Sequence, residues 1–449
     1  MNITKNLRIP LLVGLALMLA VVPLTGQVRV QCPGDLNGDG IPDPTVPGKH
    51  QRNDLFDPNV ACKHITGGDG FVQMADGKLQ YVFGFHDVTG IGDTDGDGNI
   101  TNEVFAAASL GATFPAPTLV MREGQRFYLT LTNVGMVNRP DLFDPHTVHY
   151  HGFPQSSTIF DGLPESAVAI TMGASFTYFY NVVNPGTFLY HCHAEATEHM
   201  QMGMLGSLYV KPGQDLRSDG TLLGTHVHVN DGDADNPPYG NFPGLEDVDN
   251  GTKGVFDEGT HHQYAYNDND GSTRYDVDKT IQISGFDPIF HDASMSVQPL
   301  PFAAMLDRYH MINGRGYPDT VDTAPKGSLP ENNGIFSQPT NALISAGPGK
   351  IVLLRISNVN ITTASTLISP SLPMKVVGLD AKELAQGSTK LHYTTNSLNL
   401  GGGQSADVLI TIPATATPGS RYFLYSANLN FLSNDGQDLG GVMTEILVE

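Results

Sequence analysis

The consecutive residues His191-Cys192-His193 constrain the fold of this chain more than any other part of its sequence. In an extended strand successive side chains point to opposite faces, so the two His share one face and Cys192 points to the other. Such a strand offers a thiolate on one side and two imidazoles on the other. The segment therefore predicts metal chemistry on both faces of a β-strand.

The upstream segment 146–151 carries three His with a related spacing. His149 and His151 share a face, and His146 falls on the opposite face if the strand is regular. Together the two segments predict an inner site, which takes one ligand from each, and an outer site that holds the paired His. Because the His at 191 and 193 flank Cys192 covalently, an electron on the thiolate has a short through-bond route to the outer site.

Copper is the metal that these side chains favour. A mononuclear blue-copper centre uses two His and one Cys thiolate in a near-trigonal plane, with a long axial Met. His146, Cys192, His199 and Met204 match that set, and Met202 is the alternative axial ligand. Zinc also accepts Cys and His, but a single Cys beside several His and a Met favours copper.

The first 26 residues resemble a secretory signal peptide. Lys5 and Arg8 precede an apolar run over 11–24, and small residues follow it. The alternative is a retained N-terminal anchor, although a run of roughly 14 residues is short for a bilayer, which needs about 20. We expect export to the periplasm or the extracellular space.

The net charge and the two other Cys limit the kinds of partner and the redox compartment that we expect. A formal net charge of −22 argues against nucleic acid and anionic membranes as partners and is compatible with attracting cations. With Cys192 assigned to the metal, Cys32 and Cys62 are left either as a disulfide in an oxidising compartment or as two free thiols.

Short alternating runs bounded by Gly, Asn or Pro, such as 126–132 and 175–180, are typical of antiparallel sandwiches. We find no long amphipathic helix, so we expect an all-β chain. The expected parts are a loop-rich acidic segment, a copper-binding domain, a connector and a second domain, at residues 27–75, 76–212, 213–274 and 275–449. The second domain repeats the first, since residues 422–428 (YFLYSAN) match 187–193 (TFLYHCH) with the ligands replaced.

Two acidic segments, 35–43 and 93–100, resemble calcium loops, with oxygen-bearing side chains at alternate positions and Gly at the turn. In the second loop Glu103 falls at position 11, whereas the EF-hand pattern has its bidentate acid at 12. We expect either structural calcium or solvated acidic turns there. Segments 231–235 and 267–271 are weaker matches.

On these residues the chain resembles the multicopper oxidase family, which is built of cupredoxin domains with a Greek-key β-sandwich fold. The resemblance in the first domain runs through Phe114-Pro115-Ala116-Pro117, Glu123-Gly124, Asn133, Val148-His149-Tyr150-His151-Gly152, Asp161-Gly162 and Gly186-Thr187-Phe188-Leu189-Tyr190-His191-Cys192-His193. In the second domain it is looser, through residues 312–314 and 353–358.

The resemblance implies a laccase-like, copper-dependent oxidase. It implies that a type 1 copper takes electrons from a phenolic or metal-ion donor and that its ligands are His146, Cys192, His199 and Met204. It also implies that oxygen is reduced to water at a type 2/type 3 cluster, with catalytic ligands at His149, His151, His191 and His193.

The chain departs from the family pattern in two ways. Six residues separate Cys192 from His199, where the common three-domain oxidases have four. The cluster of the family takes eight His from two facing domains, and the first domain supplies only four. The remaining ligands would come from a homo-oligomer such as a trimer or from a partner chain, unless the site holds fewer metals. The His at 226, 228, 261 and 262 are expected to be ordinary surface His.

Two other functions remain open at this stage. One is an electron-transfer or copper-binding protein with only the type 1 centre. The other is a trimeric nitrite reductase, but those enzymes carry Asp where His149 stands and lack a His after the Cys.

Overall fold

The computed structural model describes residues 27–35, 39–42, 59–216, 263–438 and 440–449. Their regular secondary structure is mostly β-strand, which confirms the expected all-β fold. Their α-helices are short: α2 (Thr101–Ala108), α3 (Ala196–Gln201) and α4 (Pro288–Met295). None of the described helices is long and apolar enough to cross a membrane.

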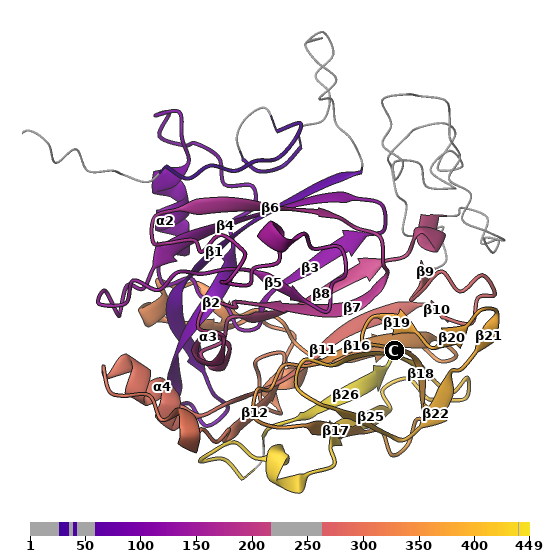
Figure 1. Cartoon of the computed structure of the whole chain (residues 1–449). Helices are drawn as coiled ribbons and strands as arrows, with labels where there is room; N and C mark the ends of the chain where they lie inside the picture. The colour runs from indigo at the N-terminus through magenta and orange to yellow at the C-terminus, as the bar shows by residue number, and fades with distance from the viewer. Residues whose placement is uncertain (1–26, 36–38, 43–58, 217–262, 439) are drawn as a thin grey trace, which may run out of the picture.

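Two β-sandwiches pack against each other, the first in indigo to magenta and the second in orange to yellow (Figure 1). The first sandwich has sheets of order β2-β1-β4-β6 and β3-β8-β7-β5. Its strands are β1 (Val60–Gln73), β2 (Leu79–Asp87), β3 (Ala116–Arg122), β4 (Arg126–Gly135), β5 (His149–His151), β6 (Ser175–Asn181), β7 (Gly186–His191) and β8 (Leu205–Lys211).

The second sandwich has sheets of order β12-β11-β16-β24-β18-β19, with β22 also paired to β18, and β15-β26-β25-β17-β23. Its strands are β11 (Val277–Phe286), β12 (Tyr309–Ile312), β15 (Ile344–Ala346), β16 (Ile351–Asn358), β17 (Ser365–Ile368), β18 (Met374–Leu379), β19 (Lys382–Glu383), β22 (Tyr393–Thr395), β23 (Ser397–Leu400), β24 (Ser405–Thr411), β25 (Arg421–Ser426) and β26 (Met443–Val448). Two-stranded sheets are formed by β9 (Gln263–Tyr264) with β10 (Arg274–Tyr275), β13 (Lys326–Ser328) with β14 (Phe336–Gln338), and β20 (Ala385–Gln386) with β21 (Thr389–Lys390).

The strand order of the first sandwich recurs in the second, which adds β18, β19 and β22 to one sheet and β23 to the other; this agrees with the expected repeat. The parallel pair β1/β4 corresponds to β11/β16, and the parallel pair β3/β8 corresponds to β15/β26. Strand β25 is the counterpart of β7, the strand that leads into Cys192.

One boundary differs from the expectation. The strand Val60–Gln73 lies in the segment 27–75, which we expected to be loop-rich, and it pairs with both β2 and β4. Its Gly-rich sequence disguises it, since a strand through Gly67, Gly68 and Gly70 has few side chains to show an alternating pattern. The first sandwich therefore begins near Val60.

Each sandwich has its own apolar core, and a third cluster joins the two. The joining cluster contains Phe114 and Leu189 from the first sandwich and Phe286 and Val359 from the second, all of them buried. The rings of Phe114 and Phe286 lie 4.4 Å apart between centroids. This packing sets β7, with its metal-binding end, beside the second sandwich.

Candidate metal centres

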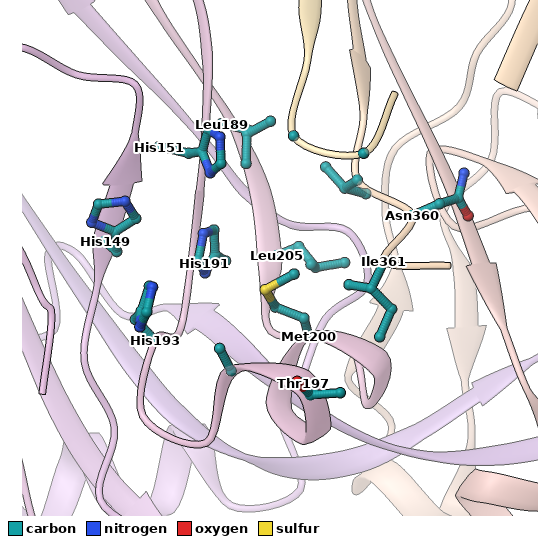
Figure 2. A pocket seen from close by; sticks show the side chains of 14 residues that line it. His149, His151, Leu189, His191, His193, Thr197, Met200, Leu205, Asn360 and Ile361 are labelled. Carbon is teal, nitrogen blue, oxygen red and sulfur yellow. The ribbon is translucent and has the colours of Figure 1, made fainter. Parts of the chain in front are cut away.

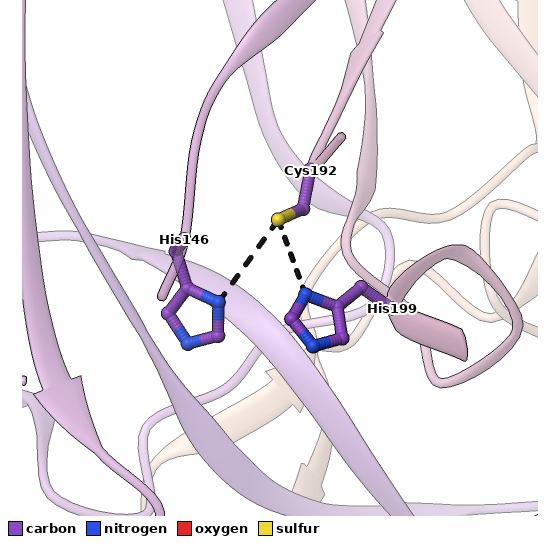
Figure 3. A group of neighbouring side chains, drawn as sticks. All are labelled: His146, Cys192 and His199. Atoms are coloured by element: carbon purple, nitrogen blue, oxygen red, sulfur yellow. Dashed lines mark hydrogen bonds between the residues drawn. The ribbon is translucent and has the colours of Figure 1, made fainter. Parts of the chain in front are cut away.

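The inner site forms where three predicted ligands meet inside the first sandwich. His146 makes an isolated β-bridge to Ile170, Cys192 directly follows β7, and His199 lies on α3. The Cys192 Sγ lies 3.2 Å from Nδ1 of His199 and 4.0 Å from Nδ1 of His146 (Figure 3). All three side chains are fully buried, so the structure brings together a thiol and two imidazole nitrogens away from water.

Met204 also reaches this site. A Cβ placed on Gly67 would lie 2.7 Å from Cδ2 of His146 and 3.2 Å from the terminal methyl of Met204, so both side chains converge above this glycine of β1. The Met204 amide donates to the carbonyl of His199, and the Cys192 amide donates to the carbonyl of Met204. Met204 is thus tied to two ligands, and Gly67 is small because the site needs its space.

Residues around the inner site favour positive charge on His199, beside the sulfur of Cys192. Burial lowers the pKa of His199, but the nearby Cys192 and the Asp144 carboxylate, whose Oδ2 lies 3.7 Å from its Nε2, raise that pKa to about 10. Burial, with His199 beside it, holds the pKa of His146 well below its usual value. The Thr147 amide points at Cys192 Sγ from 3.5 Å. Without metal the site already stabilises a cation beside the sulfur, and a metal ion would displace that proton.

The outer site follows from the register of β5 and β7. His149 lies directly opposite His191 and His151 opposite Leu189, so their side chains share one face of the sheet. Ligand nitrogens of His149, His151 and His191 lie within 4.8 Å of one another. The His193 ring lies 5.2 Å from that of His149 and 5.5 Å from that of His191, between centroids (Figure 2).

Two carbonyl groups orient the outer imidazoles. Nδ1 of His149 lies 2.6 Å from the Asp161 carbonyl oxygen, and Nδ1 of His191 lies 2.9 Å from that of Cys192. A carbonyl oxygen only accepts, so in both rings Nδ1 carries the proton and Nε2 keeps its lone pair. Burial lowers the pKa of His191 to about 3, so this ring stays neutral and ready to bind a metal.

A cavity of about 480 Å³ opens onto the outer site. Besides the four His, the first sandwich lines it with Leu189, Ala196, Thr197, Met200 and Leu205, and the second sandwich lines it with Val359, Asn360, Ile361, Gly402 and Gly403. Figure 2 shows Asn360 and Ile361 across the cavity from the imidazoles. Three imidazoles with space in front of them form the kind of open site in which a metal ion keeps a position for a substrate.

The donor chemistry of both sites fits copper. A buried thiol with two imidazoles and a thioether is the blue-copper set, and an all-imidazole site also suits copper. Cys192, His146, His199 and Met204 would hold the first ion. The structure places the outer His on one face of the sheet and Cys192 on the other, as the alternation of side chains along a strand predicted.

Other predictions from the sequence have mixed outcomes. Cys32 and Cys62 form the expected disulfide. Oxygens of Asp93, Asp95 and Asp97 lie within 4.8 Å of one another on the surface, while Glu103 accepts bonds from the loop amides of residues 94 and 95, so calcium stays a prediction. The His at 226, 228, 261 and 262, with segment 231–235, lie outside the described residues, as does the centre of loop 35–43.

Sequence reasoning missed three residues that shape these sites. Asp144 faces His199, Asp161 orients His149 through its carbonyl, and Gly403 packs on His151 from the second sandwich. The segment Asp161-Gly162 was noticed only as part of a resemblance. For Gly403 the sequence held no signal, since the contact joins residues 252 positions apart.

Known proteins resemble this chain in sequence and in fold. Two models described as multicopper oxidase match residues 97–215 and 291–449. The iron transport multicopper oxidase of Kluyveromyces lactis is 33% identical over 139 residues, which cover 30% of this chain and 20% of that protein. The L-ascorbate oxidase of Cucurbita pepo var. melopepo is 35% identical over 111 residues, 23% of this chain and 18% of that protein.

The segments matched in this chain thus cover a fifth or less of the length of each of these two relatives. Among solved structures, the blue copper oxidase from Nitrosomonas europaea has a similar fold, with a TM-score of 0.54 at 18% identity over 86% of this chain and 85% of that chain. With both sandwiches matched by models of one family, this chain belongs to the multicopper oxidases, whose metal is copper.

Proposed function

We propose that the chain is an exported, copper-dependent oxidase that takes electrons one at a time from a donor and reduces oxygen. The observation that carries the proposal is covalent: Cys192 of the inner site is bonded directly to His191 of the outer site, and on its other side to His193, whose ring lies beside that site. When bound, copper supplies a one-electron couple at the inner site and reactivity toward oxygen at the outer site.

The chain's own residues define where a donor approaches. His199 reaches from the thiolate of Cys192 to a surface that carries Asp144 and Glu195, whose carboxylates gather around its ring. Negative charge at this surface favours a cationic donor, such as a reduced metal ion, over a neutral phenol. Both donors belong to the proposal, and their relative rates distinguish them.

Oxygen uptake tests this function directly. Copper-loaded protein should consume oxygen with ferrous iron or a phenol as donor, and Cys192→Ser should abolish the uptake because it removes the thiolate. Asp292→Asn, at an exposed ion pair with Lys78, serves as the control and should leave uptake unchanged. Protein that binds copper at both sites but consumes no oxygen with either donor would disprove the proposal.

An electron-transfer protein is the second candidate. The observation that favours it is the wall of the outer cavity, where the second sandwich contributes Val359, Asn360, Ile361 and two Gly but, among the described residues that line it, no His or Cys. If the outer site plays no part, the double variant His149→Gln with His193→Gln should exchange electrons with a donor as fast as the parent protein. A loss of oxygen uptake in that variant would favour the oxidase.

Export is supported by the disulfide between Cys32 and Cys62, because disulfides persist in oxidising compartments. The mass of the mature N-terminus tests whether residues 1–26 are removed. The sequence also left open that further ligands come from a second copy of the chain, as in a trimer, and sedimentation of the copper-loaded protein tests this alternative.

A further inference from the structure

The outer site is covered by the second sandwich of the same chain. Gly403 lies in the turn before β24 with a φ of +82°, and a Cβ placed on it would lie 2.9 Å from both Cε1 and Nε2 of His151. Only a glycine brings the backbone this close to the ring. The space beside this edge of the His151 ring is therefore filled by backbone of the second sandwich.

The segments that form this cover are held by hydrogen bonds. The Gly403 amide donates to the carbonyl of Asn358, and the Asn358 amide donates to that of Gln404. The Asn360 amide donates to the side-chain oxygen of Asn358, and a Cβ on Gly402 would lie 2.2 Å from the Asn360 carbonyl oxygen. Residues 358–360 and 402–404 therefore hold each other in place beside the outer site.

Polar contacts clamp the two sandwiches together around the cavity. The Thr187 hydroxyl donates to buried Asp407 at 2.6 Å. On the other side of the cavity, the Gln201 amide of α3 donates to buried Asp307 at 2.9 Å. Admitting a domain from another chain would break these contacts and expose the apolar cluster that joins the sandwiches.

Three of the four outer imidazoles have nitrogens close enough together to bind one ion. His149, His151 and His191 have nitrogens within 4.8 Å of one another, whereas His193 stands outside that group, beside His149 and His191. Three converging imidazoles with an open fourth position suffice for a mononuclear site. Four His from a single domain are half of what a trinuclear cluster of this family uses.

We propose that the outer site is complete within one chain: His149, His151 and His191 hold a single copper ion, and the second sandwich closes the site with Gly403 and contributes no ligand. The chain then carries two copper ions, one at each site. The open position faces a cavity whose walls include Leu189, Leu205 and Ile361, which suits a small and largely apolar molecule. This inference shares with the proposed function only the binding of copper.

A copper count on matched glycine variants tests the inference. The parent protein should bind two copper ions per chain, with one type 1 and one type 2 signal of equal intensity in electron paramagnetic resonance. Gly403→Ala should weaken the type 2 ion at least about tenfold, because its methyl group would displace His151, and should leave the blue band intact. The control is Gly419→Ala: its φ of +88° gives a comparable backbone cost, but a Cβ there has nothing within 4 Å. His151→Gln should also remove the type 2 ion, because it deletes a ligand without adding a group beside the site.

Four results would overturn the inference, and the first three concern the copper count, chain association and Gly403→Ala. They are a count of three or four copper ions per chain, a second ion that binds only when chains associate, and an unchanged type 2 ion in Gly403→Ala. The double variant His226→Gln with His228→Gln should keep both ions, and loss of one there would equally overturn it. Two bound ions without oxygen uptake would instead contradict the proposed oxidase and leave this inference standing.

Discussion

At the scale of single residues, the inner site depends on neighbours that bind no metal. Asp144 stands 3.7 Å from Nε2 of His199, the nitrogen opposite the one that faces Cys192. Gly67 leaves the room in which Met204 and His146 converge. Such neighbours fix the orientation and the basicity of the ligands, so their replacement should be felt at the metal.

Asp144→Ala should weaken copper binding at the inner site about 10-fold to 100-fold, because His199 loses the carboxylate that orients it. A competition titration against a chelator, followed by the blue band, measures this change. Asp292→Asn is again the surface control. Unchanged affinity in the Asp144 variant would show that α3 holds His199 in place without the carboxylate.

Buried His64 predicts a loss of stability in acid. Its Nε2 lies 2.8 Å from the Thr132 hydroxyl, and burial lowers its pKa from 6.5 to about 4. The unfolded chain therefore takes up a proton between about pH 6.5 and 4 that the folded chain refuses, so stability falls as the pH falls through this window, by up to roughly 3 kcal/mol.

His64→Gln should remove this part of the pH dependence in urea unfolding of the copper-free protein at pH 7 and pH 4.5. Thr132→Val keeps the imidazole and should keep the steeper dependence. If the free energy of unfolding changed equally with pH in the parent protein and in His64→Gln, His64 would not be the source of this pH dependence.

At the scale of elements, β7 is held from both sides. It pairs with β5 and β8 in its own sheet, and it leans on β24 of the second sandwich through Asp407. The Asp407 carboxylate also accepts from the Tyr266 hydroxyl at 2.6 Å and lies 3.7 Å from the Arg355 guanidinium, all of them buried. A charge at this depth is stable only because donors surround it.

Asp407→Ala should lower the free energy of unfolding by about 3 to 5 kcal/mol, since it leaves buried Arg355 with less compensation and two hydroxyls without their acceptor. Urea unfolding of the copper-free protein measures the loss. Asp435→Asn, at a partly exposed pair with Arg308, should change stability by less than about 1 kcal/mol. If both variants lost the same small amount, Asp407 would not hold the two sandwiches together.

At the scale of the whole molecule, the described chain is one duplicated fold whose halves have diverged. The first sandwich keeps the ligands, while the second keeps the strand order and supplies the wall of a cavity. A disulfide over a separation of 30 residues ties the N-terminal segment to β1, which pairs at the centre of the first sandwich.

Replacing both Cys32 and Cys62 by Ala should destabilise the protein by about 3 to 4 kcal/mol if the bond acts by restricting the unfolded chain. Thermal unfolding of the oxidised, reduced and substituted proteins measures this effect. The reduced protein and the double variant should agree, and the blue band should survive in both, because Cys192 lies outside the disulfide. Equal melting temperatures in all three forms would contradict the prediction.

Much of the metal chemistry could be predicted from the sequence because it depends on local geometry. The alternation of side chains along a strand separates Cys192 from His191 and His193 whatever the rest of the chain does, and the same rule pairs His149 with His151. The all-β fold follows from short alternating runs in the same way, and its duplication follows from the match of residues 422–428 with 187–193. The strand from Val60 escaped this reasoning, since its glycines carry no pattern.

The sequence alone identified the side chains that could bind copper, and it placed the His of the outer site and Cys192 on opposite faces of their strands, because period-two alternation is a property of the local backbone. What faces these side chains depends on the tertiary structure. The approach of Asp144 to His199, and of Gly403 to His151, joins residues that no local rule connects, since packing of separate loops and sandwiches sets such distances. The number of copper ions in the outer site therefore depends on the fold, while their ligands can be identified from the sequences of the strands.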